Sequence, residues 1–301
     1  MSRTSLLAVG APALFVFLWS TGFISAKLGL PYIEPMTFLV LRFVATGAGF
    51  LALVLWLGLA WPSPRVVLHQ CVAGLLLQGV YLGGVFASLA LGVEAGASAL
   101  IVGLQPLLVA AVAAPLLGER VGARQWVGLA MGLLGVGLVV AEKLGRGLGT
   151  PLGVLLSVLA LFGITAGTLY QKRFGAGVDL RVGNVFQFGA AAIVTGALAL
   201  AFEEQRIDWT PSLVLALAWS ILVLSFGAVS LLYVLIRKGA AARVSSLFFL
   251  VPPTTALMAW AMFAERLPPL AILGMAIAMV GVALVNRPAA RARPRKARWP
   301  R

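Results

Sequence analysis

The chain alternates between long apolar stretches and short polar turns from one end to the other. A helix needs about 20 apolar residues to cross the hydrocarbon core of a bilayer, and most of these stretches have that length. We therefore predict an all-α integral membrane protein with ten transmembrane helices. The predicted helices lie at approximately residues 7–26, 36–58, 66–91, 97–117, 123–141, 150–171, 183–202, 212–236, 243–263 and 268–286.

One part of the chain occurs twice. Residues 104–139 align without a gap on residues 250–285, and 12 of the 36 pairs are identical. Chance would give roughly four identical pairs in a chain of this composition, so we interpret the match as an internal repeat. The identical pairs include Pro106 with Pro252, Glu119 with Glu265, Arg120 with Arg266, Gly128 with Gly274 and Gly135 with Gly281. Each copy predicts an apolar helix with a central proline, a charged turn and a Gly-rich helix.

Composition agrees with a membrane protein and argues against metal chemistry. Apolar residues make up 61% of the chain and charged residues 11%, whereas soluble domains are near 45–50% and 25%. The single cysteine, Cys71, excludes an intramolecular disulfide and a thiolate metal site. The single histidine, His69, excludes a histidine cluster. No metal and no cofactor is predicted.

The basic residues predict the orientation in the membrane. If the N-terminus is cytoplasmic, 17 of the 23 Lys and Arg residues lie on the cytoplasmic side, five lie outside, and Arg42 lies within a span. This bias predicts a multi-pass protein of the cell (inner) membrane with both termini in the cytoplasm. The net charge of +14 is scattered between the spans, and seven basic residues lie in 287–301. Such a tail is typical of contact with anionic lipid, so no nucleic-acid partner is predicted.

Five spans in each half is an odd number, so two similar halves must insert with opposite orientations. We predict a first five-helix repeat at 1–141, a second at 142–286 and a basic disordered tail at 287–301. Inverted repeats are typical of secondary transporters, whose binding site lies near mid-membrane where the halves meet.

Several motifs occur in a fixed order along the two halves. The first half contains Trp19-Ser20-Thr21-Gly22-Phe23 followed by Lys27, then Arg42-Phe43, and then Gln105-Pro106-Leu107 running to Gly118-Glu119-Arg120. The second half contains Val251-Pro252 running through Glu265-Arg266 to Gly274 and Gly281, but has Thr165-Ala166-Gly167 where Trp19-Ser20-Thr21 would be expected. With these motifs, residues 7–286 resemble the drug/metabolite transporter superfamily and its EamA family. The resemblance implies ten spans, cytoplasmic termini and transport of small metabolites, often export of amino acids.

Pro106 and Pro252 are predicted to lie within spans and to act as hinges. A proline leaves the carbonyl four residues earlier without a helical partner, here that of Val102 and that of Phe248. A kink at the same place in both halves favours a central cavity. The alternative is a packing kink without ligand contact.

Three charged residues receive structural interpretations. Glu119 and Glu265 end the fourth and ninth spans, and we expect each to organise its turn by pairing with a neighbouring Arg. Arg42 lies about seven residues into the second span, where an ionisable group is a functional candidate. The competing interpretation is that Arg42 extends to the surface or pairs with Glu34 or Glu94.

Polar and amphipathic side chains within the spans define the predicted pocket. Trp19, Gln78, Tyr81 and Gln105 are expected to line it, because aromatic walls and amide groups suit a small zwitterion with an apolar side chain. The full set of predicted substrate-binding residues is Trp19, Ser20, Gln78, Tyr81, Ser98, Gln105, Thr165, Thr168, Tyr233 and Ser246. For each Ser and Thr, a hydrogen bond to its own helix backbone is the alternative.

The leading hypothesis is a secondary transporter of a small metabolite that works by alternating access of the two inverted repeats, without proton coupling. Together with the resemblance, it predicts export of amino acids, including apolar and aromatic ones. An intramembrane lipid-modifying enzyme is the second class, although the spans show neither a metal cluster nor a nucleophile with a base. Export of nucleosides, sugars or drugs, and a channel or receptor, are further alternatives. Small residues at helix-packing spacing, such as Gly128 and Gly132, allow either a monomer or a homodimer.

Overall fold

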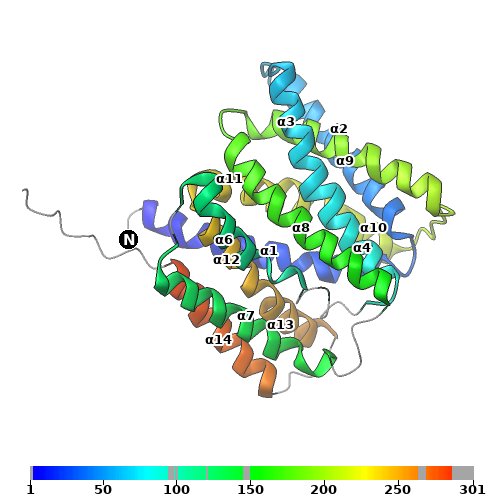
Figure 1. The fold of residues 1–301 in the computed structure, drawn as a ribbon. Helices are drawn as coiled ribbons and strands as arrows, with labels where there is room; N and C mark the ends of the chain where they lie inside the picture. The colour runs from blue at the N-terminus through cyan, green and yellow to red at the C-terminus, as the bar shows by residue number, and fades with distance from the viewer. Residues whose placement is uncertain are drawn as a thin grey trace, which may run out of the picture.

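The computed structural model describes residues 3–93, 98, 101–119, 121–144, 150–263 and 269–286. Regular structure in this part of the chain is helical, apart from one isolated bridge between Ile33 and Ile207 (Figure 1). Seven of the described helical stretches are long and apolar enough to cross a membrane. The predicted tail, 287–301, lies outside the described residues.

The helices of the first half are α1 (Arg3–Gly29), α2 (Pro35–Trp56), α3 (Pro64–Gly74), η1 (Leu75–Val80), α4 (Tyr81–Ala90), α6 (Gln105–Leu117) and α7 (Ala123–Leu144). Those of the second half are α8 (Pro151–Phe174), α9 (Leu180–Phe202), α10 (Pro211–Trp219), η2 (Ser220–Val229), α11 (Ser230–Lys238), α12 (Ala241–Ser246), η3 (Leu247–Leu250), α13 (Val251–Phe263) and α14 (Pro269–Asn286). Several begin with a proline, whose missing N–H costs nothing at a first helical position. Thr150 and Thr210 also cap α8 and α10 with their side chains.

Departures from α-helix occur at matching places in the two halves. The π-helical segments η1 and η2 interrupt the long stretches Pro64–Ala90 and Pro211–Lys238, and a shift of 146 positions places the start of η1 one residue inside η2. A turn at 103–104 comes directly before α6, and the 3₁₀ segment η3 comes directly before α13. Pro106 and Pro252 are therefore each the second residue of a helix that follows a break. The repeat seen in the sequence extends to these backbone irregularities.

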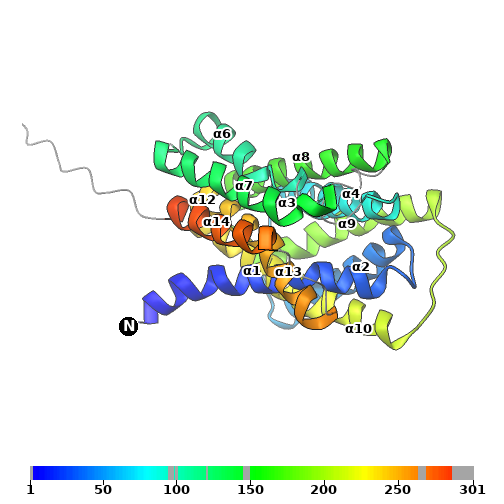
Figure 2. The same cartoon turned by 90° about the horizontal axis from the view of Figure 1, so that it is seen from below.

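The two Gly-rich helices, α7 and α14, pack antiparallel and very closely (Figures 1 and 2). A Cβ atom at Gly128 would lie 2.6 Å from the carbonyl oxygen of Gly281, and one at Gly135 would lie 2.5 Å from that of Gly274. Because Gly128 corresponds to Gly274 and Gly135 to Gly281, exchanging the halves exchanges these two contacts. The halves are thus related by an approximate two-fold axis across which equivalent helices run in opposite directions.

The same exchange relates most other helix pairs, with one clear exception. Helix α8 packs along α3, η1 and α4, and its counterpart α1 packs along α10, η2 and α11. Helix α9 also lies closely against α3 and η1, whereas its counterpart α2 makes weaker contact with α10 and η2. The space for a Cβ atom at Gly74 is filled by the backbone of Gln187, so only glycine permits this approach of α3 to α9. The structure is therefore closed between α3 and α9 and looser between α10 and α2.

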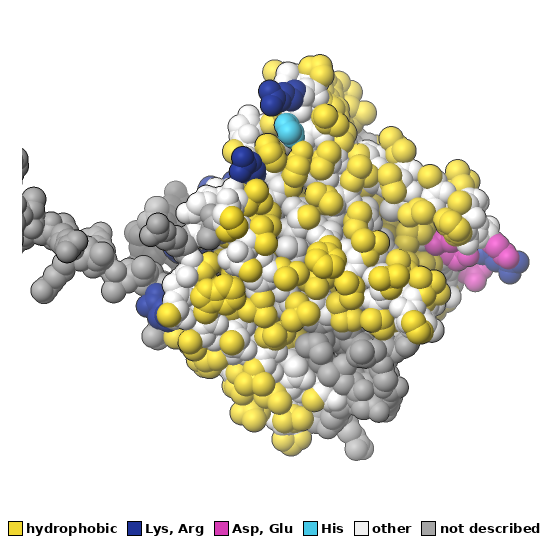
Figure 3. Space-filling model, in the orientation of Figure 1, with side chains coloured by type: hydrophobic (Ala, Val, Ile, Leu, Met, Phe, Trp, Pro, Cys, Tyr) yellow, Lys and Arg dark blue, Asp and Glu magenta, His cyan; other side chains and the backbone are white. Residues whose placement is uncertain are grey.

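Large apolar side chains cover the surface, and charges gather at its two ends (Figure 3). Trp56, Ile193, Leu200 and Phe202 are at least three-quarters exposed, which is typical of contact with lipid tails. At the basic end, helices finish or begin with Lys172, Arg173, Arg181, Arg237, Lys238 and Arg243. At the acidic end, the loops around Glu34 and Glu203–Asp208 interlock through hydrogen bonds and the bridge at Ile33. The protein is a multi-pass membrane protein.

We expect Gly135→Leu to destabilise the protein, because the added side chain meets the backbone of α14 and cannot be accommodated by a rotamer change. Overpacking of this kind costs about 1–3 kcal/mol, which thermal unfolding in detergent would detect as a lower melting temperature. Gly137→Leu is the matched control, since a Cβ atom at Gly137 meets no atom within 4 Å. Equal melting temperatures for the two variants would contradict the close α7–α14 contact.

Candidate functional site

Two adjoining cavities lie between the halves, and Trp19, Tyr81 and Val85 line both. The larger cavity is further lined by Gly22, Ala26, Arg42, Leu82, Phe86, Leu89, Leu224 and Val229. The smaller is further lined by Ser98, Val102, Gly103, Phe248, Val251 and Pro252. The first half contributes residues of α1, α2 and α4 together with Ser98, Val102 and Gly103, which precede α6. The second half contributes residues of η2, η3 and α13. The cavities therefore occupy the junction of the two repeats.

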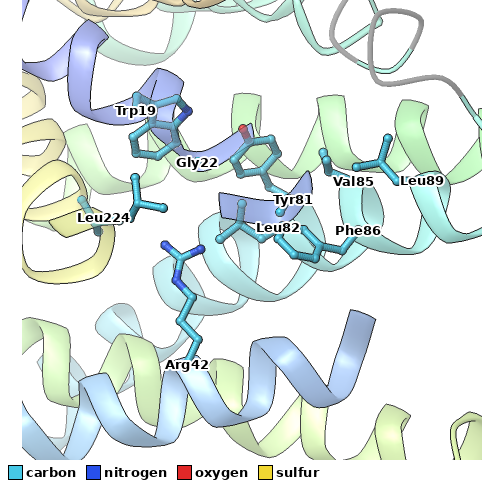
Figure 4. A pocket seen from close by; sticks show the side chains of 11 residues that line it. Trp19, Gly22, Arg42, Tyr81, Leu82, Val85, Phe86, Leu89 and Leu224 are labelled. Carbon is cyan, nitrogen blue, oxygen red and sulfur yellow. The ribbon is translucent and has the colours of Figure 1, made fainter. Parts of the chain in front are cut away.

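The larger cavity combines aromatic and aliphatic walls with one buried cation. The Arg42 guanidinium points from α2 into the space below Trp19, between Leu82 and Leu224 (Figure 4). Its Nε donates a hydrogen bond of 2.9 Å to the hydroxyl of Ser225, and its Cζ lies 5.9 Å from the ring centre of Phe43. Arg42 is only 5% exposed, so the surface position considered from the sequence does not describe this structure.

Space for water exists beside this charge. The larger cavity offers about 50 Å³ to the centre of a water molecule, several times the roughly 10–15 Å³ that one water needs. The free-energy cost of burying a guanidinium is far smaller when water molecules remain in contact with it. The cavity can thus hold a polar solute group next to Arg42 in exchange for water.

The smaller cavity lies at the two helix breaks. Val102 and Phe248, which precede Pro106 and Pro252 by four residues, both line it. The carbonyl of Phe248 accepts instead from the N–H of Val251 at the end of the 3₁₀ segment η3. Irregular backbone at membrane depth is tolerated where it lines a cavity or is buried in protein, which is the arrangement found here. Ser98 reaches the same cavity and accepts a 3.1 Å hydrogen bond from Ser157. The prolines thus shape this cavity, with Pro252 in its wall.

Other residues of the predicted pocket lie elsewhere in the interior. Gln78 donates to the Tyr233 hydroxyl at 3.3 Å, and Gln105 donates to Thr168 at 3.3 Å and to Ser245 at 3.1 Å. None of these residues lines either cavity. In the structure, Trp19, Tyr81 and Ser98 of the predicted pocket line the cavities, whereas Gln78, Gln105, Thr168 and Tyr233 bond to one another and to Ser245 elsewhere in the interior.

The remaining predicted Ser and Thr residues bond to backbone. Ser20 donates to Val16 at 2.7 Å and lies 3.3 Å from the carbonyl of Val251. Thr165 donates to Leu161, and Ser246 donates to Arg243. These contacts match the alternative of a bond within the same helix, and for Ser20 they add a link between α1 and α13.

The sequence match to known proteins covers both halves. A model described as the EamA-like transporter family matches residues 6–141 and again residues 151–287. The chain belongs to the EamA-like transporter family. The resemblance noted from the motifs is confirmed, and the family model matches once in each half of the chain.

Relatives of this EamA-like transporter are named as transporters. It is 26% identical over 286 residues to the uncharacterized inner membrane transporter YedA of Escherichia coli K12, covering 94% of this chain and 92% of that protein. It is 24% identical over 281 residues to a probable amino-acid metabolite efflux pump of the same organism, covering 89% and 91%. A probable terminal-alkyne amino-acid exporter of Streptantibioticus cattleyicolor is 28% identical over 201 residues, covering 65% of each.

A solved structure described only as the crystal structure of a protein has the same fold. It superposes with a TM-score of 0.77 at 22% sequence identity and covers 95% of this chain and 98% of that one. At this identity the likeness establishes the fold alone.

A cluster of carboxamides that the sequence did not predict lies where α3, α8 and α9 of the transporter meet. Gln187 donates to Gln70 at 2.8 Å and lies 3.4 Å from the oxygen of Gln171. Side-chain atoms of all three, and of Gln78, Gln105 and Asn184, are buried without a hydrogen-bond partner. The available signal was a carboxamide within an apolar span, but the sequence could not show that three such residues converge.

Charged residues of the transporter organise the basic end. The Glu119 carboxylate accepts a 2.7 Å hydrogen bond from the backbone N–H of Ala241 at the start of α12, and lies 3.9 Å from Lys172. Its repeat partner Glu265 lies outside the described residues. Nearby, hydrogen bonds from the Arg181 side chain lower the pKa of Asp179 to about 2, which keeps the cap of α9 ionised.

If the cavities take up water, a cysteine in their wall should react with a small thiol reagent. In a Cys71→Ser background, Val85→Cys should react with methyl methanethiosulfonate at least about tenfold faster than Ala191→Cys, because a thiol ionises poorly away from water. Val85 lines both cavities, whereas Ala191 is fully buried in α9. Mass spectrometry of the intact protein gives both rates, and equal rates would show that the cavities are dry.

Proposed function

We propose that this protein is a secondary transporter that exports small metabolites, chiefly amino acids with apolar or aromatic side chains, by alternating access of two inverted five-helix repeats. The observation that supports it most directly is the position of the cavities, whose walls come from both halves and contain Trp19, Tyr81 and Arg42. Membership of the EamA-like family and the names of the relatives agree with this function.

The membrane arrangement is part of the proposal. Ten crossings would consist of the seven long apolar stretches together with α1, residues 97–117 and α7. The antiparallel contact of α7 with α14 supports an inverted arrangement, since equivalent helices of inverted repeats run in opposite directions. We place the basic end in the cytoplasm because Lys and Arg are concentrated on the cytoplasmic side of membrane proteins. We place the protein in the inner membrane because its relative YedA is named an inner membrane transporter.

The unequal packing of equivalent helices supports alternating access. Here α9 is closed against α3 at the basic end, while α2 is looser against α10 at the acidic end. If the halves exchange these conformations, α3 and α9 separate while α2 and α10 close. The second state would then be open at the basic end instead of the acidic end. Ser220, the counterpart of Gly74, lets α10 approach α2 less closely than α3 approaches α9.

The carboxamide cluster supports the same two-state description. An unpaired buried polar group costs about 1–3 kcal/mol, and Gln70, Gln171 and Gln187 each contain one in the closed contact. Separation of α3 from α9 would let water bond to these atoms. Their hydration offsets part of the lost packing and keeps the two states close in free energy, as a transport cycle requires.

The cavity walls support the choice of substrate class. Trp19, Phe86 and the aliphatic side chains give an apolar surface, and Arg42 and Tyr81 supply polar groups. In the described part of the chain neither cavity is lined by an acidic residue. We therefore propose exchange or facilitated transport without proton coupling through a central carboxylate. Two relatives have names that refer to amino acids.

Vesicles containing the purified protein should show saturable exchange of L-phenylalanine or L-leucine, which continues when the pH gradient is collapsed. Sugars and nucleosides belong in the same panel, and protein-free vesicles are the control. Transport of a sugar or nucleoside but of no amino acid would overturn the proposed substrate class. Loss of all flux on collapse of the gradient would overturn the uncoupled mechanism.

Locking the α3–α9 contact should stop transport. With Cys71→Ser, Gln70→Cys and Gln187→Cys combined, a short bifunctional thiol reagent should join residues whose side chains now lie 2.8 Å apart and abolish exchange. Each single cysteine variant, treated in the same way, should retain its flux, and cleavage of the link should restore it. Undiminished exchange in the fully cross-linked protein would mean that α3 and α9 do not separate.

A further inference from the structure

The charge of Arg42 has no partner of opposite sign in the part of the chain that the structure describes. Its only described hydrogen bond is from Nε to Ser225, and no described carboxylate lies within ion-pair distance. Glu34, one of the partners considered from the sequence, instead accepts hydrogen bonds from the backbone of Glu204 and Arg206 at the acidic end. Glu94, the other partner considered from the sequence, lies outside the described residues. A guanidinium remains protonated in proteins, so a buried positive charge faces the cavity without a counter-charge among the described residues.

Repeat symmetry indicates that the fold does not require this charge. A shift of 146 positions places Arg42 on Phe188, which packs against Phe43 and Phe50 with ring centres 5.8 Å and 6.1 Å away. The residue that corresponds to Ser225 is Gly79. Structural features such as the prolines and the glycines at α7 and α14 recur in both halves, whereas the Arg42–Ser225 pair occurs once. This pattern favours a role in ligand binding.

The geometry defines what this charge can bind. Ser225 holds Nε, which leaves the two terminal nitrogens directed into the cavity (Figure 4). Two parallel N–H groups of a guanidinium match the two oxygens of a carboxylate. Beyond the guanidinium the walls are Leu82, Leu224, Trp19 and Phe86, which fit an apolar or aromatic group attached to that carboxylate.

An ammonium group would find no partner of opposite charge among the described lining residues. No acidic residue lines either cavity in the described part of the chain, so a cationic group would meet aromatic faces, hydroxyls and backbone near Val102 and Phe248, but no carboxylate. A second carboxylate would have no second cation, because Arg42 is the one basic residue among the described lining residues. Recognition therefore depends on a single carboxylate.

We infer that Arg42 binds the carboxylate of the transported solute, and that the site selects monocarboxylates with an apolar or aromatic side group whether or not they carry an α-amino group. This inference rests on the proposed function, because it names the group by which that cavity recognises its solute. Amino acids are then one member of a wider class. Ser225 is a positioning residue, which directs the guanidinium.

The test compares four probes that share one side group and differ in their charged groups. L-phenylalanine and 3-phenylpropanoate have the carboxylate, whereas L-phenylalaninamide and phenethylamine lack it. Binding to the purified full-length protein in lipid nanodiscs is measured by isothermal titration calorimetry. We expect both carboxylates to bind at least about tenfold more tightly than both amines, the difference that about 1.4 kcal/mol provides.

Variants of Arg42 assign this preference to its side chain. Arg42→Gln should remove the preference for the carboxylates, whereas Arg42→Lys should keep the preference with several-fold weaker binding, because an ammonium lacks the paired N–H groups. Arg181→Gln is the matched control, since it removes one basic residue that pairs with Asp179 outside the cavities. If Arg42→Gln does not fold, the carboxylate affinity of Arg42→Lys is the deciding measurement. A charge with only a structural role would be replaced fully by lysine, and the affinity would then be unchanged.

Three results would overturn the inference: tighter binding of the amines, an unchanged carboxylate preference in Arg42→Gln, or full affinity in Arg42→Lys. Failure of the proposed function is distinguishable from these results. Transport of amino acids with an Arg42-independent carboxylate preference would remove only the inference. Arg42-dependent transport of 3-phenylpropanoate without transport of any amino acid would remove only the proposed amino-acid substrates.

Discussion

The structure depends on the inability of lipid to form hydrogen bonds. Backbone groups within the hydrocarbon must be satisfied inside the protein, which forces the chain into helices. The same constraint restricts where helices can be broken, because each interruption must be covered by protein or face an internal cavity. In this transporter the π segments η1 and η2 and the breaks before Pro106 and Pro252 all meet this condition. Residues of η2, of η3 and of the turn before α6 line the cavities, so this irregular backbone lies at the candidate site, whereas η1 packs against α8 and α9.

Duplication places these irregularities at equivalent points on either side of an approximate two-fold axis. The packing of α7 on α14 follows this symmetry closely, because exchanging the halves turns the contact of Gly128 with Gly281 into that of Gly274 with Gly135. The contact of α3 with α9 does not, since its counterpart between α10 and α2 is looser. Alternating access, as proposed above, requires a second state in which the looser contact closes and the closed one opens, at a free energy near that of the first.

Arg42 shows how function can depart from the repeat. Phe188, Gly189 and Gly79 occupy the positions equivalent to Arg42, Phe43 and Ser225, so the second half lacks a buried cation there. The buried cation thus lies on one side of the axis, while the elements that bend and pack occur on both. In the proposed transport cycle, a solute bound at Arg42 would lie off the axis and still be enclosed by both halves.

The sequence determined the class of protein, because helix length in a membrane follows from local composition alone. It also determined the repeat, since identical spacing of Pro106 and Pro252 needs no coordinates. Helix boundaries agree within a few residues for the reason that prolines and capping residues such as Thr150 act locally.

Only the tertiary structure decided which side chains share a cavity. Gln78 and Tyr81 are three residues apart, which predicts one helical face, yet the wider turn of η1 directs Gln78 to Tyr233 and leaves Tyr81 at the cavities. Gln70, Gln171 and Gln187 converge from three helices, and Arg42 meets Ser225 across 183 positions of sequence. These contacts depend on how helices cross, which local composition does not encode.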